Sequence, residues 1–303
     1  MEKIEKILLL GSSGQIGSNL KKKIRSIAKI IRCLSKKDLN LEKLSFIKTK
    51  LDKFKPNLII NASAFTKVDE AEKNKKKCFR INVSSTKEIA KWAFKNKCFL
   101  IHYSTVYIFD GKKKKPWNEK DKAKPINYYG KCKLEAEKEI ISSKCDYLIL
   151  RLNWVYNEKG ENFPKKIIRI IKKKKKIFLV NNQTGTPNDA EFISAMTVKI
   201  LKTIIQSKIN PKILNLSARG SVNYFDLAKK ILKNSQGKLK KVELIPINSN
   251  IYTKIKKKPN IAARPLNSLL NITKLEKFLN TKMPDWENIF IKKVPTLIRN
   301  YKK

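Results

Sequence analysis

The segment YYGKCKLEAE, residues 128–137, places Tyr129 and Lys133 four residues apart in a stretch that favours helix. On a helix this spacing puts both side chains on one face, close enough for the ammonium to act on the phenol. A free tyrosine has a pKa of about 10, and a neighbouring cation lowers that pKa. The pair is therefore a candidate proton donor and its tuning cation.

The spacing by itself does not define a site. The chain contains 70 Lys+Arg, only eight of them Arg, and nine Tyr, so a few such matches arise by chance. Tyr252 and Lys256 form a second match. A catalytic interpretation of Tyr129 and Lys133 needs a cofactor site and a sheet edge to place them.

A glycine cluster near the N-terminus supplies the first of these. The segment LLLGSSGQIGSNL contains Gly11, Gly14 and Gly17, three of only nine glycines, between an apolar run and an amphipathic stretch. Gly11 permits a tight turn, Gly14 lets the backbone approach a pyrophosphate, and Gly17 allows close packing of helix on strand. The phosphates would lie at the helix N-terminus. The pattern favours dinucleotide binding over a plain turn.

The cofactor type is indicated after the second expected strand. Ser35, Lys36 and Lys37 precede Asp38 there. A hydroxyl and two cations suit a ribose 2′-phosphate, whereas an NAD-preferring fold usually places an acid at this point. The sequence therefore favours NADPH, with NADH as the alternative.

Two further segments end expected strands. NASAF, residues 61–65, provides small side chains such as Ala62 beside the cofactor ribose. HYSTVY, residues 102–107, brings the Thr105 hydroxyl to the carboxyl edge of the sheet, where ligands bind in open α/β folds. His102 lies three residues further inside, and we interpret it as a strand histidine and not as a base.

Alternating apolar runs and amphipathic stretches predict the architecture. Strands are expected at 6–11, 29–34, 57–63, 98–105 and 146–154, with helices between them, and this order indicates an α/β fold with a doubly wound parallel sheet of the Rossmann type. We assign residues 1–157 to the dinucleotide-binding domain and 158–303 mainly to a smaller substrate-binding portion, with 212–217 returning to the sheet.

Composition argues against several other classes of function. The formal net charge of +45 comes from scattered lysine runs with little Arg, which indicates a solvated surface and no specific nucleic-acid partner. Five unclustered Cys indicate free thiols, and a single His rules out the usual zinc sites. The apolar run at 7–10 is too short to span a membrane, so we expect a cytoplasmic protein. A role for Mg²⁺ and a homodimer are both left open.

Several motifs together resemble the dTDP-4-dehydrorhamnose reductase family of extended short-chain dehydrogenases/reductases. They are GSSGQIG, NASAFTKVDEAE, IHYSTVYIFDG, YYGKCKLEAE, LNWVY, NQTGTP, ARPLNS and PDW, which extend over nearly the whole chain. The resemblance implies that Tyr129 and Lys133 are the catalytic pair, Thr105 the assisting hydroxyl and Trp154 a substrate contact. It also implies a set of residues around the cofactor, namely Gly14, Gln15, Ile16, Asp38, Leu39, Ala64, Phe65, Thr66 and Tyr103.

The implied reaction is reduction of the C4 keto group of dTDP-4-dehydro-L-rhamnose, with hydride from the nicotinamide and a proton from Tyr129. Lys133 would stabilise the phenolate and hold the nicotinamide ribose. Two acids of the family pattern are missing here. Val106 stands where the family has Asp beside the sugar, and Asn182 replaces the acid before Gln183. Val106 therefore leaves the exact sugar open.

Three alternatives remain at this point. The chain could reduce another nucleotide-linked 4-keto-6-deoxy sugar, which Val106 favours. It could be a non-catalytic dinucleotide-binding subunit like the regulatory subunit of methionine adenosyltransferase, which the complete set of Thr105, Tyr129 and Lys133 disfavours. The third, a basic nucleic-acid binder, is disfavoured by the scattered lysines.

Overall fold

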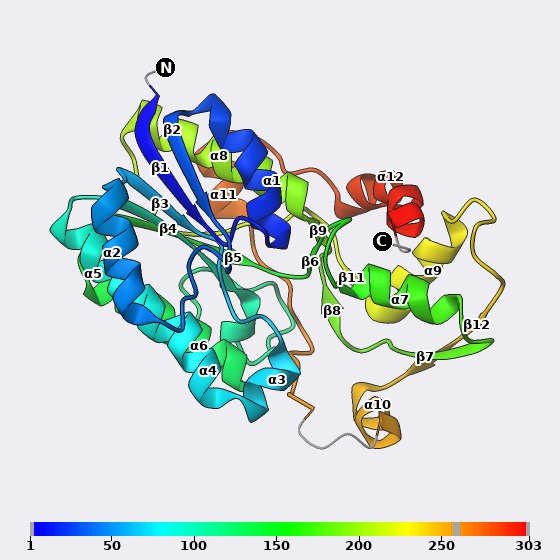
Figure 1. Cartoon of the computed structure of the whole chain (residues 1–303). Helices are drawn as coiled ribbons and strands as arrows, with labels where there is room; N and C mark the ends of the chain where they lie inside the picture. The colour runs from blue at the N-terminus through cyan, green and yellow to red at the C-terminus, as the bar shows by residue number, and fades with distance from the viewer. Residues whose placement is uncertain (1–2, 257–260, 301–303) are drawn as a thin grey trace.

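Figure 1 shows the computed structural model, which describes residues 3–256, without the side chain of Lys256, and 261–300. Its centre is a six-stranded parallel sheet in the order β10-β5-β4-β3-β1-β2. The strands are β1 (Ile4–Leu10), β2 (Ala28–Leu34), β3 (Leu58–Asn61), β4 (Phe99–Thr105), β5 (Tyr147–Leu152) and β10 (Ile213–Asn215). The predicted doubly wound parallel sheet is confirmed.

The strand β1 shows why the sheet is central. Ile7 and Leu9 belong to the apolar cluster on one face, and Leu8 and Leu10 belong to the cluster on the other. Because successive side chains of a strand point to opposite faces, an uninterrupted apolar run fits only a sheet that is covered on both sides.

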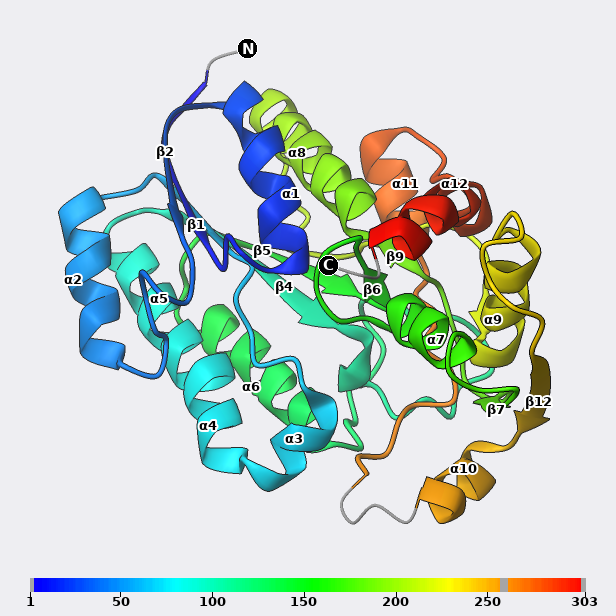
Figure 2. The same ribbon diagram turned by 45° about the vertical axis from the view of Figure 1, so that its right-hand side comes forward.

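Helices cover both faces (Figures 1 and 2). The face that includes Leu8 is covered by α2 (Leu44–Phe54), α5 (Ser85–Lys95) and α6 (Tyr128–Ser142). The other face is covered by α1 (Gln15–Lys23), α8 (Ala190–Ser207) and α11 (Thr273–Leu279). Short helices complete this half: α3 (Val68–Lys73), α4 (Lys75–Phe79), a π-helix (Arg80–Ser84) and 3₁₀ turns at Ile24–Ser26 and Val106–Ile108.

The remaining elements form a smaller region beside the carboxyl ends of the strands (Figure 2). Its helices are α7 (Phe163–Ile171), α9 (Tyr224–Lys233), α10 (Ser249–Lys256) and α12 (Trp286–Arg299). Its strands form three pairs: β7 (Lys176–Val180) with β12 (Glu243–Ile247), β6 (Val155–Tyr156) with β9 (Asn188–Asp189), and β8 (Thr184–Gly185) with β11 (Val222–Asn223). The chain returns from this region to the sheet through α8, β10 and α11, and the division at residue 157 stays a prediction.

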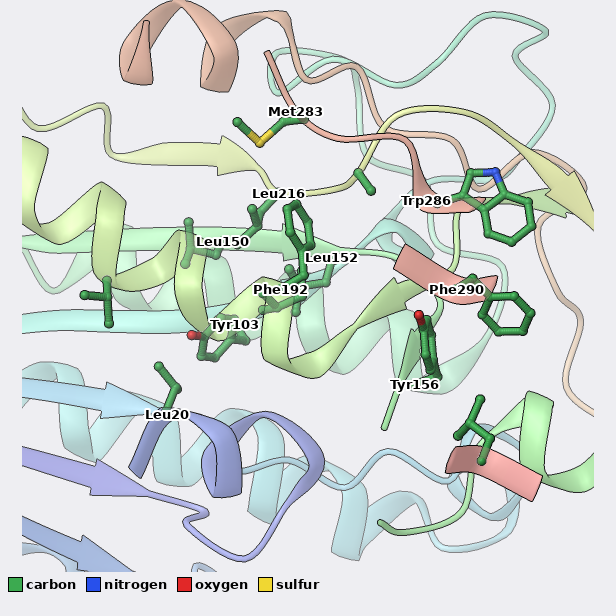
Figure 3. Close-up of a cluster of buried hydrophobic side chains, with 14 of the residues drawn as sticks. Leu20, Tyr103, Leu150, Leu152, Tyr156, Phe192, Leu216, Met283, Trp286 and Phe290 are labelled. Carbon is green, nitrogen blue, oxygen red and sulfur yellow. The ribbon is translucent and has the colours of Figure 1, made fainter. Parts of the chain in front are cut away.

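One apolar cluster joins the two regions. Figure 3 shows Leu150 and Leu152 of β5 and Phe192 of α8 together, with Tyr156 and Phe290 continuing the cluster toward α12. Tyr156 and Phe290 meet edge to face with ring centroids 5.3 Å apart. The smaller region is therefore packed onto the sheet through a shared core, which fixes the walls of any cleft between them.

No helix among the described residues is both long and apolar enough to cross a membrane.

Candidate active site

A cleft of about 710 Å³ opens at the carboxyl ends of the central strands, between the sheet and the smaller region. This volume is in the range of small-molecule sites. Most of the predicted site residues line it, namely Gly14, Gln15, Ile16, Ala62, Ala64, Thr66, Tyr103, Thr105, Val106, Tyr129, Lys133 and Trp154. The structure thus brings together residues that are far apart in the sequence.

The glycine turn forms one end of the cleft. A Cβ atom on Gly17 would lie 2.1 Å from the carbonyl oxygen of Gly11, so α1 packs directly against the turn that precedes it. Gly11 itself has φ of +76°, which a side chain disfavours. The N-cap of α1 is Gly14, which has no side-chain cap, and no acid lies in the first turn. These free amide groups fit an anionic pyrophosphate.

The other predicted cofactor residues lie beside the cleft and do not line it. Gly11 forms the turn and Gly17 packs against it from α1, Leu39 is buried in the core, and Phe65 is bonded through its backbone to Asn82. After β2, the Ser35 hydroxyl donates to Asp38 Oδ2 at 2.6 Å, and the Ser35 amide donates to the same atom at 2.8 Å. These bonds hold the pKa of Asp38 below its ordinary value. Asp38 therefore orders the turn that carries Lys36, and the Ser35 hydroxyl already has a partner.

Tyr129 lies at the start of α6 and faces Thr105. The helix begins where it does because the Asn127 side chain accepts a hydrogen bond from the Gly130 amide at 2.8 Å. The phenol of Tyr129 is hydrogen-bonded to the Thr105 hydroxyl at the end of β4. The predicted donor and its assisting hydroxyl are thus adjacent.

Burial raises the pKa of the Tyr129 phenol, and the hydrogen bond from Thr105 only partly offsets that rise. Desolvation by burial therefore dominates the pKa of Tyr129 in this structure, and the lowering expected from Lys133 together with the nicotinamide stays a prediction. A phenol with a raised pKa stays protonated at neutral pH, which is the form that a reductase needs to donate a proton.

Lys133 is itself fully buried, with 1% of its surface exposed. Its Nζ lies 2.6 Å from the carbonyl oxygen of Tyr103 and 2.7 Å from Nε2 of His102. Burial lowers the pKa of Lys133 to about 8, and the carboxylate of Glu137 opposes that shift. His102 lies in β4, where its burial and the neighbouring Lys133 lower its pKa well below the ordinary value.

Trp154 also lines the cleft. Its ring stacks on Tyr224 with centroids 4.1 Å apart and planes 9° apart. On the other side, a Cβ atom on Gly185 would lie 2.5 Å from the indole. The indole is thus held between an aromatic ring and a glycine backbone, and this fixes its orientation before a ligand arrives.

We expect Gly185→Ala to displace Trp154 and to raise KM for the sugar nucleotide by about tenfold, since overpacking costs about 1–3 kcal/mol. The Kd for NADPH should change little, because Gly185 lies on β8 in the smaller region, away from the glycine turn. Steady-state kinetics and a fluorescence titration with NADPH measure the two effects. An equal loss of affinity for both ligands would show that Trp154 does not act on the sugar alone.

Three cleft-side groups were missed from the sequence. Tyr107 and Tyr224 hydrogen-bond to each other, and Arg264 donates to Tyr107. Arg264 also pairs with Asp69 Oδ1. The scarcity of Arg was a usable signal, since Arg264 lies in the quoted ARPLNS motif, but the two tyrosines come from distant segments with no spacing to join them.

Val106 lies in the 3₁₀ turn after β4 and borders the cleft, with 1% of its surface exposed. It packs with Ile108, Phe109 and Trp117.

Two hydroxyl groups of β4 differ in their partners. The Tyr103 hydroxyl bonds to Thr197 Oγ1 at 2.7 Å. Ser104, beside it in β4, also borders the cleft and has no partner for its buried hydroxyl among the described residues.

No group of three or more His, Cys, Asp or Glu side chains that could hold a metal ion occurs in the part of the chain that the structure describes. The five Cys are free thiols.

Comparisons with known proteins agree with this geometry. The family model of the RmlD substrate binding domain matches residues 5–299. The chain is 31% identical over 287 residues to the dTDP-4-dehydrorhamnose reductase of Salmonella typhimurium, covering 93% of this chain and 94% of that protein. The Escherichia coli K12 enzyme of the same name is also 31% identical, with the same coverage.

Solved structures give the same result. The dTDP-4-dehydrorhamnose reductase of Bacillus anthracis, in complex with NADP, superposes with a TM-score of 0.83 at 27% identity and covers 100% of this chain and 99% of its own. The Clostridium acetobutylicum orthologue gives a TM-score of 0.84 at 26% identity, covering 95% and 97%. Together with the cleft and its glycine turn, these matches show that the chain belongs to the dTDP-4-dehydrorhamnose reductase family.

Proposed function

We propose that this protein uses NADPH to reduce the C4 keto group of dTDP-4-dehydro-L-rhamnose to dTDP-L-rhamnose. The observation that carries the proposal is the Tyr129 phenol, hydrogen-bonded to Thr105 inside the same cleft as the glycine turn. Relatives that bear this enzyme name support the substrate.

The cofactor would be held along the carboxyl ends of the strands. The uncapped N-terminus of α1, at Gly14, Gln15 and Ile16, would receive the pyrophosphate. Ala62, Ala64, Phe65 and Thr66 follow β3, Tyr103 lies in β4, and all five would lie beside the riboses. Bound, the dihydronicotinamide supplies the hydride.

We assign the 2′-phosphate to the turn after β2. Lys36 and Lys37 are the cations there, with Asp38 and Leu39 completing the turn, while the Ser35 hydroxyl orders it through Asp38. The NADP-bound relative supports NADPH over NADH. Comparing kcat/KM for the two cofactors tests this assignment, and equal values would contradict it.

Three side chains would perform the proton transfer. Thr105 and Tyr129 both hydrogen-bond the keto oxygen of the sugar, where negative charge develops as hydride arrives at C4. Tyr129 then donates its proton to that oxygen. Lys133, when charged, stabilises the phenolate that remains and contacts the nicotinamide ribose. Trp154 would pack against the sugar nucleotide.

The direct test is NADPH oxidation, followed at its absorbance maximum, with purified protein and dTDP-4-dehydro-L-rhamnose. Cofactor consumption and formation of dTDP-L-rhamnose are expected. NADPH binding without oxidation, for any dTDP-linked keto sugar, would favour the non-catalytic subunit.

Val106 supports a second candidate, a reductase of another nucleotide-linked 4-keto-6-deoxy sugar. Where the family has Asp, this side chain offers no hydrogen bond to a sugar hydroxyl, and one such bond is worth about 1–3 kcal/mol. We expect Val106→Asp to raise kcat/KM for the rhamnose precursor about tenfold, measured beside Val106→Thr as a control of similar shape. If the Asp variant shows no gain, a different sugar is the substrate.

The surface and location complete the proposal. We infer that the protein has no specific nucleic-acid partner, because its ion pairs and lysines are spread over many elements. We also infer that it works in the cytoplasm, because its free thiols fit a reducing compartment. Nucleic-acid affinity that persists at physiological salt and depends on base sequence would contradict this. A homodimer and a contribution from Mg²⁺ remain to be tested by sedimentation and by chelator titration.

A further inference from the structure

The environment of Lys133 contains a chain of hydrogen bonds that the mechanism above does not use. It runs from the Ser63 amide through Asn61 and His102 to Lys133. Asn61, His102 and Lys133 are each 1% exposed. Because water cannot replace a missing partner at such depth, every donor in this chain needs an acceptor.

The orientation of Asn61 is fixed by the backbone. The Ser63 amide can only donate, and it lies 3.1 Å from Oδ1 of Asn61. The carbonyl oxygen of the Asn61 side chain must therefore face Ser63, and its NH₂ group must face Nδ1 of His102, 3.3 Å away. The assignment of oxygen and nitrogen in the Asn61 side chain therefore rests on the Ser63 N–H, which can only donate, and not on the shape of the amide group.

The orientation of Asn61 in turn fixes the imidazole. Facing a donor, Nδ1 of His102 must be the nitrogen without a proton, so the proton of the neutral ring is on Nε2. Nε2 lies 2.7 Å from Nζ of Lys133. An ammonium at that distance would oppose one N–H to another. A neutral amine accepts the imidazole N–H and still donates to the carbonyl oxygen of Tyr103 at 2.6 Å.

We propose, on the basis of the reductase function above, that His102 is a positioning residue that favours the neutral amine of Lys133 by offering it a donor in place of an acceptor. The charged form needed to stabilise the Tyr129 phenolate then exists only at a lower pH than is usual for lysine. The alkaline limb of the activity profile is set by this contact.

The other titratable groups around Lys133 do not take over the role of His102 in setting the protonation of the amine. Glu137, one turn along α6, makes hydrogen bonds to Arg151 at 2.7 and 3.0 Å. Its hydrogen bond with Cys132, together with burial, raises the pKa of the Cys78 thiol on α4, which keeps that thiol neutral. The groups that face Lys133 are thus His102 on β4, Cys78 on α4, and Tyr129, Cys132 and Glu137 on its own helix. Among them His102 is a hydrogen-bond partner of Nζ.

The proposal has a direct spectroscopic test because His102 is the single histidine of the sequence. A long-range ¹H–¹⁵N spectrum of the ¹⁵N-labelled protein without added ligand reports which ring nitrogen carries the proton. We expect a neutral imidazole protonated at Nε2 near pH 9, where a lysine whose pKa is lowered to about 8 is a neutral amine. A ring protonated at Nδ1 would overturn the proposal, whether or not any variant folds.

Asn61→Asp should reverse the donor and acceptor roles along this chain of hydrogen bonds. A carboxylate accepts from both the Ser63 amide and Nδ1 of His102, so the ring proton should move to Nδ1 and Nε2 should accept from an ammonium. We expect the tautomer to switch and the alkaline limb of kcat/KM to move up by about one pH unit. An unchanged tautomer, or a switched tautomer with an unmoved limb, would overturn the proposal.

Asn82→Asp is the matched control. Asn82 is also buried, at 2% exposure, and bonds the backbone of Phe65 and the Cys78 thiol near Lys133 without touching His102. It adds the same charge nearby, so the ring should stay protonated at Nε2. A tautomer switch in this variant would attribute the effect to the field of the carboxylate and overturn the proposal. Absence of activity with every keto sugar would count against the proposed function, and the tautomer is still measured independently.

Discussion

Tyr129→Phe is expected to lower kcat for NADPH-dependent reduction by about 10²–10⁴-fold, the usual contribution of a positioned proton donor. The phenol is the group hydrogen-bonded to Thr105 in the cleft, and its raised pKa keeps it protonated at working pH. The Kd for NADPH should change by less than about twofold, since the glycine turn is untouched. Stopped-flow or steady-state NADPH oxidation gives kcat, and fluorescence titration gives Kd.

Tyr128→Phe is the control, because it removes a phenol from the adjacent residue of the same helix. Tyr128 does not border the cleft, and its ring lies beside the Lys75 ammonium at 5.6 Å. This variant should retain nearly full activity. If Tyr129→Phe kept near-normal kcat, or if both variants lost activity equally, Tyr129 would not be the proton donor.

Gly17→Ala is expected to have the second largest effect, on both stability and cofactor binding. The new Cβ would lie 2.1 Å from the carbonyl oxygen of Gly11, and a backbone atom cannot move aside cheaply. Overpacking of this kind costs about 1–3 kcal/mol. Because α1 must shift relative to the turn, its amide groups lose their alignment with the pyrophosphate, and the Kd for NADPH should rise about tenfold or more.

Thermal unfolding and NADPH titration measure the two consequences. Ser18→Ala, at the next residue of α1, serves as the control, because its hydroxyl makes only a 3.3 Å bond to the Gln15 carbonyl. This control should leave both quantities nearly unchanged. Wild-type affinity and Tm in Gly17→Ala would mean that the turn does not hold the cofactor phosphates.

The sequence by itself determined the fold and predicted many of the residues that line the cleft. Its uninterrupted apolar runs identify strands buried on both faces, and the glycines at 11, 14 and 17 identify the turn between β1 and α1. The four-residue spacing of Tyr129 and Lys133 placed both on one face of a helix. These features are local, so periodicity, turn chemistry and motif resemblance suffice to find them.

The tertiary structure decided the chemical state of the site. His102 appeared in the sequence as a strand residue, and only the fold places it 2.7 Å from Lys133. The same applies to Arg264, which the fold brings to Tyr107, and to the pKa of Tyr129, which burial raises. Protonation depends on desolvation and on hydrogen-bond partners from distant segments, and a one-dimensional pattern contains neither of these quantities.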